Sequence, residues 1–376
     1  MAVSTKQKGK QSGPQNTAIP QKENSEKKKF LFRSVPVYIF LLLCIIPACS
    51  VAFYIHYFIP EKYMSSSSGI SDQNAATVKV VRENELSLVR PILFVDIEND
   101  KVFNPVKTKI NNYIEQKKQD GSLICASVYL KDFNTGYCFN INPDSLYDPA
   151  SLVKVPLLMI YLKQAETNPA LLKKTYVFKR NPSNTTVKLI KDKSLEDGKS
   201  YTVEELLRYM IVYSDNEAYW MLSNYIDGST LNNLDTKLDI PSNFDITHYP
   251  TSEKHIISNV NSVAHYFNVL YNASYLDIPM SVYALDLLAK STYKDGFVKE
   301  IGSDITVAHK FGERTLSYMA DGQLKNLQSE FHEFGIVYLK NRPYLLGVMT
   351  RGNQSDQLQA MVGNISKIVF DELKAD

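Results

Sequence analysis

The sequence predicts an α/β (α+β) fold, in which an antiparallel five-stranded sheet is flanked by helices and joined to an all-helical lobe. Three observations lead to this fold class. Alternating apolar segments occur at both ends of the C-terminal part, apolar residues at helical spacing fill its middle, and an Asn-Thr-Gly turn joins the first two alternating segments. A sheet built from both ends of this part, with the helical middle as a separate lobe, accounts for that order.

The composition is that of an ordinary globular protein. Of the 376 residues, 44% are hydrophobic and 22% are charged, and the net charge at pH 7 is +2. So small a surplus of positive charge gives no reason to expect nucleic acid as a partner.

An uncharged apolar stretch, residues 35–59, follows a basic segment at residues 1–34. The stretch exceeds the ~20 residues that a helix needs to cross a bilayer core, and Pro36 and Pro47 are tolerated in such helices. The excess of Lys and Arg before it predicts a cytoplasmic tail and an extracytoplasmic C-terminal part. We therefore expect one N-terminal transmembrane helix in a single-pass protein of the cell membrane.

Two other interpretations of this stretch compete with that of a retained anchor. A cleaved signal peptide has a shorter apolar core and a small-residue exit site. Residues 46–49, Ile-Pro-Ala-Cys, resemble a lipoprotein cleavage box, but proline is unusual there and the apolar run continues well past Cys49. Both comparisons favour the anchor.

The rest of the chain divides into a linker and one domain. Residues 60–102 contain Ser-Ser-Ser-Ser-Gly at 65–69 and show no clear periodicity, which predicts a flexible stalk. Residues 103–376 carry the predicted helices and strands and are expected to form the folded domain.

The elements of this domain follow in a clear order. A first helix has Val106, Ile110 and Ile114 at helical spacing, and the two hairpin strands come next. An apolar helix is predicted to start at or just before Ser151. The remaining predicted helices are TVEELLRYMIVYS, NEAYWMLSNYI, SNVNSVAHYFNVLYN, SVYALDLLAKS and, at the C-terminus, DQLQAMVGNISKIVFDELK. The last three predicted strands are DITVAHKFG, FHEFGIVYL and PYLLGVMTRG.

Cys125 and Cys138 flank the Asn-Thr-Gly turn. A plain hairpin that pairs Asp132 with Tyr137 puts Cys138 opposite Lys131 rather than Cys125. A disulfide would then need a bulge or a distortion, so the pattern favours two thiols over a bridge. Neither CxxC nor HExxH spacing occurs, so the sequence indicates no metal site and no cofactor.

Ser151 and Lys154 form the first candidate site, a Ser-x-x-Lys motif. Residues three apart lie on one helix face, so the hydroxyl and the amine can meet. A serine becomes a nucleophile when a base takes its proton, and a buried lysine with a lowered pKa can be that base. The same spacing at Ser25 and Ser291 lies in polar segments and is explained by a solvated pair. Only Lys154 enters a strongly apolar helix, where burial is costly without a purpose.

Two further motifs follow in the chain. Ser-Asp-Asn at 214–216 occurs once, and its purely structural explanation is an N-cap for the next helix. Lys-Phe-Gly at 310–312 ends a predicted strand, where a lysine can face a substrate carboxylate and a glycine allows close approach. The alternative for this lysine is an edge-strand residue that blunts pairing. Each of the three motifs alone is weak evidence for a catalytic site. Their occurrence together, in this order, is much more specific.

The three motifs resemble, in order and spacing, those of the class A β-lactamases and penicillin-binding proteins, which are Ser-x-x-Lys, Ser-Asp-Asn and Lys-Thr-Gly. The resemblance covers residues 103–376 and implies a β-lactamase/transpeptidase-like fold. It also implies that Ser151 is the acylated nucleophile and Lys154 its proton acceptor. Ser214 would pass a proton to the leaving nitrogen.

The resemblance implies substrate-binding roles for four more residues. Asn216 would bind the substrate amide, and Lys310 would hold the substrate carboxylate. The backbone N–H groups of Ser151 and of Glu313, the residue after Gly312, would form the oxyanion hole.

Two departures from the family pattern concern substrate binding and turnover. Phe311 replaces the usual Thr or Ser and so removes a hydroxyl from the carboxylate site, where Arg314 is near enough in sequence to supply a compensating charge. The Glu-x-x-Leu-Asn motif, whose glutamate activates the deacylating water in class A β-lactamases, is absent between Asn216 and Lys310. Glu253 lies at a suitable place but lacks the Leu-Asn partner and is equally explained as a surface residue.

The histidines indicate no second catalytic route. They are scattered, and no Asp/His/Ser order points to a triad. Those of the predicted domain are His248, His255, His265, His309 and His332. His309 precedes Lys310 on a strand and should face away from it.

Three functions remain compatible with these residues. The first is a class A β-lactamase-type hydrolase acting on β-lactams or a related amide. The second is a D-alanyl-D-alanine carboxypeptidase or transpeptidase, which would act on peptidoglycan-like substrates and release β-lactams slowly. The third is a non-catalytic binding module that kept the fold. The anchor and the missing glutamate favour the second function, and Phe311 is the best argument for the third.

Overall fold

The computed structural model describes residues 88–89, 97–98, 100–180, 194–226, 228–238, 257–320 and 323–375, and the structural statements below concern these residues. All of them belong to one compact unit, Ala76–Asp376. None of the helices in these ranges combines the length and apolarity that a membrane span requires. The predicted helix at 35–59, the tail at 1–34 and most of the stalk lie outside the described residues.

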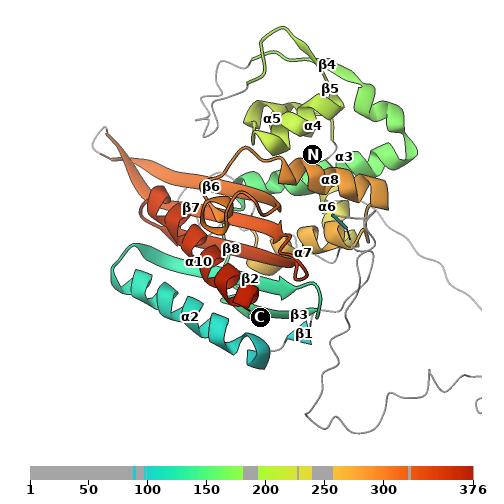
Figure 1. Ribbon diagram of the computed structural model, residues 1–376. Helices are drawn as coiled ribbons and strands as arrows, with labels where there is room; N and C mark the ends of the chain where they lie inside the picture. The colour runs from blue at the N-terminus through green and yellow to red at the C-terminus, as the bar shows by residue number, and fades with distance from the viewer. Residues whose placement is uncertain are drawn as a thin grey trace, which may run out of the picture. The chain divides into compact units, whose positions relative to one another are not determined.

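A six-stranded sheet with the order β1-β3-β2-β8-β7-β6 organises this unit (Figure 1). Its strands are β1 (Ile97–Glu98), β2 (Leu123–Asp132), β3 (Tyr137–Ile141), β6 (Val307–Ala320), β7 (Gln323–Val337) and β8 (Tyr344–Gly352). Five of them pair antiparallel, which confirms the predicted antiparallel five-stranded sheet. The sixth, β1, pairs in parallel with β3. Two residues are too few to show alternation, so the sequence did not indicate this strand.

The hairpin between β2 and β3 has the predicted register. Lys131 pairs with Cys138, and Cys125 pairs with Arg351 on β8. No disulfide joins the two cysteines. The residues of the Asn-Thr-Gly turn therefore predicted the register of this hairpin correctly.

Helices α2 (Asp100–Gln119) and α10 (Ser355–Ala375) cover one face of the sheet (Figure 1). Their buried apolar residues recur at helical spacing and meet the side chains of β2, β7 and β8 that point to this face. The residues that α2 buries are Phe103, Val106, Ile110 and Ile114. The short helix α9 (Phe297–Ile301) packs against α10 and extends the same core.

The helical lobe packs on the other face, mainly through α7 (Val260–Tyr271), which contacts β2, β7 and β8. Its other helices are α3 (Lys154–Thr167), α4 (Val203–Val212), α5 (Asn216–Ser223), α6 (Gly228–Lys237) and α8 (Ile278–Ala289). The lobe also contains a two-stranded sheet, β4 (Thr175–Val177) with β5 (Ser200–Thr202), so the prediction of an all-helical lobe was wrong in this detail. Three-residue strands carry too little periodicity to be recognised in the sequence.

Three connections bring the candidate residues together. A 3₁₀ helix, Ala150–Val153, precedes α3 and packs against β6. The short link between α4 and α5 carries residues 214 and 215, while β6 is the last strand of the sheet. An edge strand presents unpaired backbone groups on its outer side. The nucleophile candidate therefore lies where the lobe meets the free edge of the sheet.

Candidate active site

Ser151 lies in the 3₁₀ helix rather than in the α-helix that was predicted to start there, because α3 begins only at Lys154. The residue before it, Ala150, has φ 49°, in the left-handed region that non-glycine residues rarely adopt. Such strain persists only where surrounding contacts hold it, and it is frequent at functional sites.

Lys154 occupies the first position of α3 and is buried, with 1% of its surface exposed. Its Nζ lies 3.0 Å from Ser151 Oγ, 2.6 Å from Asn216 Oδ1 and 2.7 Å from the backbone oxygen of Ser214. Burial lowers the pKa of Lys154 to about 7, although the nearby Asp215 carboxylate opposes this. A large fraction of the amine is therefore neutral near pH 7 and able to accept a proton.

The Ser-Asp-Asn motif serves as a helix cap and as part of the site at once. Asp215 is the N-cap of α5, and its side chain accepts a hydrogen bond of 2.8 Å from the Ala218 backbone N–H. Ser214, with φ 52°, and Asn216 flank this cap and turn their polar atoms toward Lys154. The capping explanation and the functional one are thus not alternatives.

Lys310 reaches the same cluster from β6. Its Nζ donates to Ser214 Oγ at 2.8 Å and to the Phe311 backbone oxygen at 2.9 Å. Burial and the neighbouring positive charge of Lys154 hold the pKa of Lys310 well below its usual range, and Glu333 opposes them. Ser214 Oγ, 3.3 Å from the Nζ of Lys154, therefore lies between two lysine amines and can exchange a proton with either.

Gly312 allows β6 to approach the nucleophile closely. A Cβ at this position would lie 2.7 Å from the Pro149 oxygen and 3.3 Å from the Ser151 nitrogen, so a side chain would push the two segments apart. Glu313 follows on the same strand, and its side chain accepts a hydrogen bond from Ser355. The backbone of residues 312–313 thus runs beside the amide of Ser151.

Phe311 packs in the core on one face of the sheet, and the Nζ of Lys310 lies 4.3 Å from its ring centroid. Its ring is 2% exposed and stacks on Tyr293 with centroids 4.0 Å apart, with Phe331 at 6.2 Å. The replacement of the usual Thr or Ser therefore removes a hydroxyl, and the added ring serves packing.

The sequence profile of the beta-lactamase enzyme family matches residues 105–373. The chain belongs to this family. No curated protein matches the sequence. The same fold occurs in solved structures of low sequence identity. One is a point mutant of PBP-A in an acyl-enzyme complex with penicillin G, which is 16% identical with a TM-score of 0.59. The match covers 76% of this chain and 100% of that chain.

Two β-lactamases have the same fold. The TLA-1 extended-spectrum β-lactamase is 18% identical over 73% of this chain and 100% of its own, with a TM-score of 0.61. A class A β-lactamase from Bacteroides cellulosilyticus is 21% identical over 72% of this chain and 99% of its own, with a TM-score of 0.58. These similarities confirm the predicted β-lactamase-like architecture.

The described histidines of this β-lactamase-family chain lie outside the lysine–serine cluster, which is formed by Ser151, Lys154, Ser214 and Lys310. His309 is fully buried with its Nδ1 2.6 Å from Glu333 Oε1, which confirms that it faces away from Lys310. His332 accepts from the Thr350 N–H through Nδ1, so its Nε2 carries the proton and donates to the Asp148 oxygen at 2.9 Å. His248, His255 and Glu253 lie outside the described residues.

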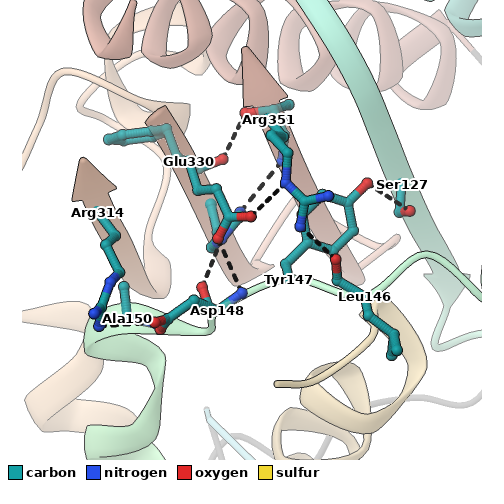
Figure 2. A network of polar contacts seen from close by, with 11 residues as sticks. Ser127, Leu146, Tyr147, Asp148, Ala150, Arg314, Glu330 and Arg351 are labelled. Atoms are coloured by element: carbon teal, nitrogen blue, oxygen red, sulfur yellow. Dashed lines mark hydrogen bonds and ion pairs between the residues drawn. The ribbon is translucent and has the colours of Figure 1, made fainter. Parts of the chain in front are cut away.

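The sequence did not indicate a polar network that lies beside Ser151, the candidate nucleophile (Figure 2). Arg314, considered above as a compensating charge, pairs through Nη1 with Asp148 Oδ2 at 2.7 Å. Burial raises the pKa of Asp148, and Arg314 partly counteracts this. Glu330 and Arg351 complete the network from β7 and β8. Its members are far apart in sequence, and no local pattern links them.

Proposed function

We propose that this chain is a membrane-anchored, extracytoplasmic serine hydrolase that β-lactams or related amides acylate at Ser151. One observation carries the proposal, namely the distance of 3.0 Å between Ser151 Oγ and the Nζ of buried Lys154. A hydroxyl beside an amine whose pKa is about 7 is an activated nucleophile.

Acylation would proceed in three proton transfers. The neutral amine of Lys154 takes the Ser151 hydroxyl proton while Oγ forms a bond to the carbonyl carbon of the substrate. The carbonyl carbon–nitrogen bond then breaks, and Ser214 gives its proton to the leaving nitrogen. Lys154 returns a proton to Ser214 Oγ across 3.3 Å, which leaves both groups as they began.

Substrate binding would use the remaining members of the cluster. Lys310 places its amine beside Ser214 to bind the substrate carboxylate, and Asn216 supplies an amide for the substrate amide. The N–H groups of Ser151 and Glu313 would stabilise the oxyanion, and one such donor contributes ~3 kcal/mol.

Two observations favour a cell-wall amide hydrolase or transpeptidase as the second candidate. The sequence lacks the Glu-x-x-Leu-Asn motif, so efficient hydrolysis of the acyl-enzyme would need another base. A point mutant of PBP-A, a protein that shares the fold, was captured as an acyl-enzyme with penicillin G. D-Alanyl-D-alanine termini of peptidoglycan would then be the natural substrate, and β-lactams would be slowly released inhibitors.

The location follows from the charge pattern of the N-terminal residues. The apolar stretch at 35–59 would be the anchor, residues 1–34 the cytoplasmic tail, residues 60–102 a stalk and residues 103–376 the extracytoplasmic domain. Protease treatment of intact cells tests this topology. We expect removal of the domain and protection of the tail, and protection of the domain would contradict it.

Covalent labelling of the full-length chain in membranes with a fluorescent penicillin tests the activity. We expect a label that disappears in Ser151→Ala and persists in Ser291→Ala, the matched control from the other Ser-x-x-Lys segment of the domain. Absence of Ser151-dependent label would overturn both enzymatic functions and leave the non-catalytic module.

The lifetime of the label separates the two enzymatic functions. A label that lasts for hours would exclude an efficient β-lactamase and support the cell-wall enzyme. Rapid turnover that depends on Ser151 but survives Glu253→Ala would show that another group serves as the deacylation base.

A further inference from the structure

The segment that leads into Ser151 is bound to the sheet through its backbone. Asp148 donates its N–H to Glu330 Oε2 at 2.9 Å and accepts from His332 Nε2 at 2.9 Å. Two residues earlier, the Leu146 oxygen accepts from Arg351 Nη2 at 2.6 Å. Figure 2 shows these contacts converging from β7 and β8 on the residues before the nucleophile.

The Asp148 side chain joins the two segments that would form the oxyanion hole. Oδ1 accepts the Ala150 N–H at 2.8 Å and so closes a turn around the left-handed residue before Ser151. Oδ2 pairs with Arg314 Nη1 at 2.7 Å, and Arg314 directly follows Glu313 on β6. One carboxylate therefore ties the residues around the Ser151 amide to those around the Glu313 amide.

The Glu330 carboxylate, which accepts the Asp148 N–H, is itself held in place by neighbouring charged side chains. The carboxylate is 1% exposed, and Arg351 Nε donates to its Oε1 at 2.6 Å. His332 and Arg351 keep the pKa of Glu330 below its usual value although burial acts in the opposite direction. Burying a charged carboxylate costs stability. Its hydrogen bonds, however, fix the positions of the groups they join more strictly than apolar packing does.

We propose that the Asp148–Arg314 ion pair, supported by Glu330, is a positioning device that sets the separation of the Ser151 and Glu313 backbone N–H groups. This inference rests on the proposed acylation at Ser151. Neither Asp148 nor Arg314 needs to touch the substrate. They act by holding two backbone segments, which Gly312 allows to come close, at the spacing that an oxyanion requires.

Single substitutions of Arg314 in the full-length chain test the device. Arg314→Gln removes the ion pair, and we expect the acylation rate constant at saturating fluorescent penicillin to fall about tenfold or more, with its non-covalent dissociation constant little changed. Arg314→Lys keeps the charge and should recover much of the rate. If Arg314→Gln does not accumulate, Asp148→Asn removes the charge while retaining an acceptor for the Ala150 N–H.

Arg342→Gln is the matched control. Arg342, in the connection between β7 and β8, pairs with Asp132 at the end of β2 at 2.9 Å, with side chains 20% and 1% exposed. This variant should lower the melting temperature and leave the acylation rate constant of the folded protein unchanged. An equal loss of rate in both variants would show that Arg314 contributes only to stability.

Amide hydrogen exchange gives a readout that does not depend on acylation. We expect faster exchange in peptides spanning 146–153 and 309–316 of Arg314→Gln, and wild-type exchange there in Arg342→Gln. Unchanged exchange at both segments would overturn the positioning role even if penicillin labels the chain. Faster exchange in a chain that penicillin does not label would support the positioning role and contradict the proposed function.

Discussion

The Nζ of Lys154 lies 3.0 Å from the Oγ of Ser151 although the two residues belong to different elements. Ser151 is held in a 3₁₀ helix after a left-handed alanine, and Lys154 starts the buried helix α3. The backbone of Ser151 thus lies beside β6, while the amine of Lys154 also contacts Ser214 and Asn216 of the lobe. Five predictions follow from this geometry and its surroundings.

Acylation of Ser151 should depend on pH through Lys154. Burial lowers the pKa of Lys154 to about 7, and the neutral form is the base, so the acylation rate constant should rise with pH around a midpoint near that value. Stopped-flow labelling between about pH 5.5 and pH 9 measures this profile. A rate independent of pH, or one that falls as pH rises through 7, would contradict the assignment of the base.

The same residue should make folding stability depend on pH. Between about 7 and 10.5 the unfolded chain holds a proton on Lys154 that the folded chain has lost. The contribution of Lys154 to the free energy of unfolding therefore rises with pH across this window. Urea unfolding at several pH values should show this slope in the wild type and a smaller slope in Lys154→Met.

Ser214→Ala should slow acylation by about 100-fold or more, because it removes the hydroxyl that links two lysine amines and delivers a proton to the leaving nitrogen. Single-turnover labelling measures the effect. Ser223→Ala, at the end of α5, is the matched control and should keep the wild-type rate. A Ser214→Ala rate within a factor of two of wild type would assign the proton transfer to another group.

Gly312→Ala should reduce acylation about tenfold or more, because its Cβ would lie 2.7 Å from the Pro149 oxygen and force β6 away from Ser151. Gly352→Ala is a matched control, since its Cβ would lie 2.5 Å from the Ser122 oxygen at the end of β8. Both variants should lose stability by about 1–3 kcal/mol. Only Gly312→Ala should lose rate per folded molecule, and equal losses would refute the close approach as the cause.

Phe311→Leu should lower the free energy of unfolding by about 1–3 kcal/mol, because the ring is 2% exposed and stacks on Tyr293. The ring packs in the core, with its centroid 4.3 Å from the Nζ of Lys310. Leucine keeps an apolar side chain there, so labelling of Ser151 by fluorescent penicillin should continue at a similar rate. Urea unfolding and labelling together check this. Loss of labelling in a folded Phe311→Leu variant would assign the ring a part in substrate binding.

The features that could be predicted from the sequence are those that depend on residues close together in the chain. Alternation and the Asn-Thr-Gly turn predicted the hairpin and the pairing of Lys131 with Cys138, because turn chemistry and side-chain period act locally. Motif order identified Ser151, Ser214 and Lys310 as candidates, and the fold brings their side chains together around Lys154. Strands of two or three residues, such as β1, β4 and β5, escaped recognition because pairing across the fold, rather than local propensity, stabilises them.

By itself the sequence determined the family, the antiparallel sheet with its helices, and which side chains are available for chemistry. Only the tertiary structure decided how those side chains behave. The lowered pKa of Lys154 arises from burial by residues distant in sequence, and the left-handed Ala150 is held by contacts to Asp148. The Asp148–Arg314 pair joins residues on opposite sides of the nucleophile. Electrostatic environment and long-range hydrogen bonds are properties of the folded chain, and no local pattern of residues encodes them.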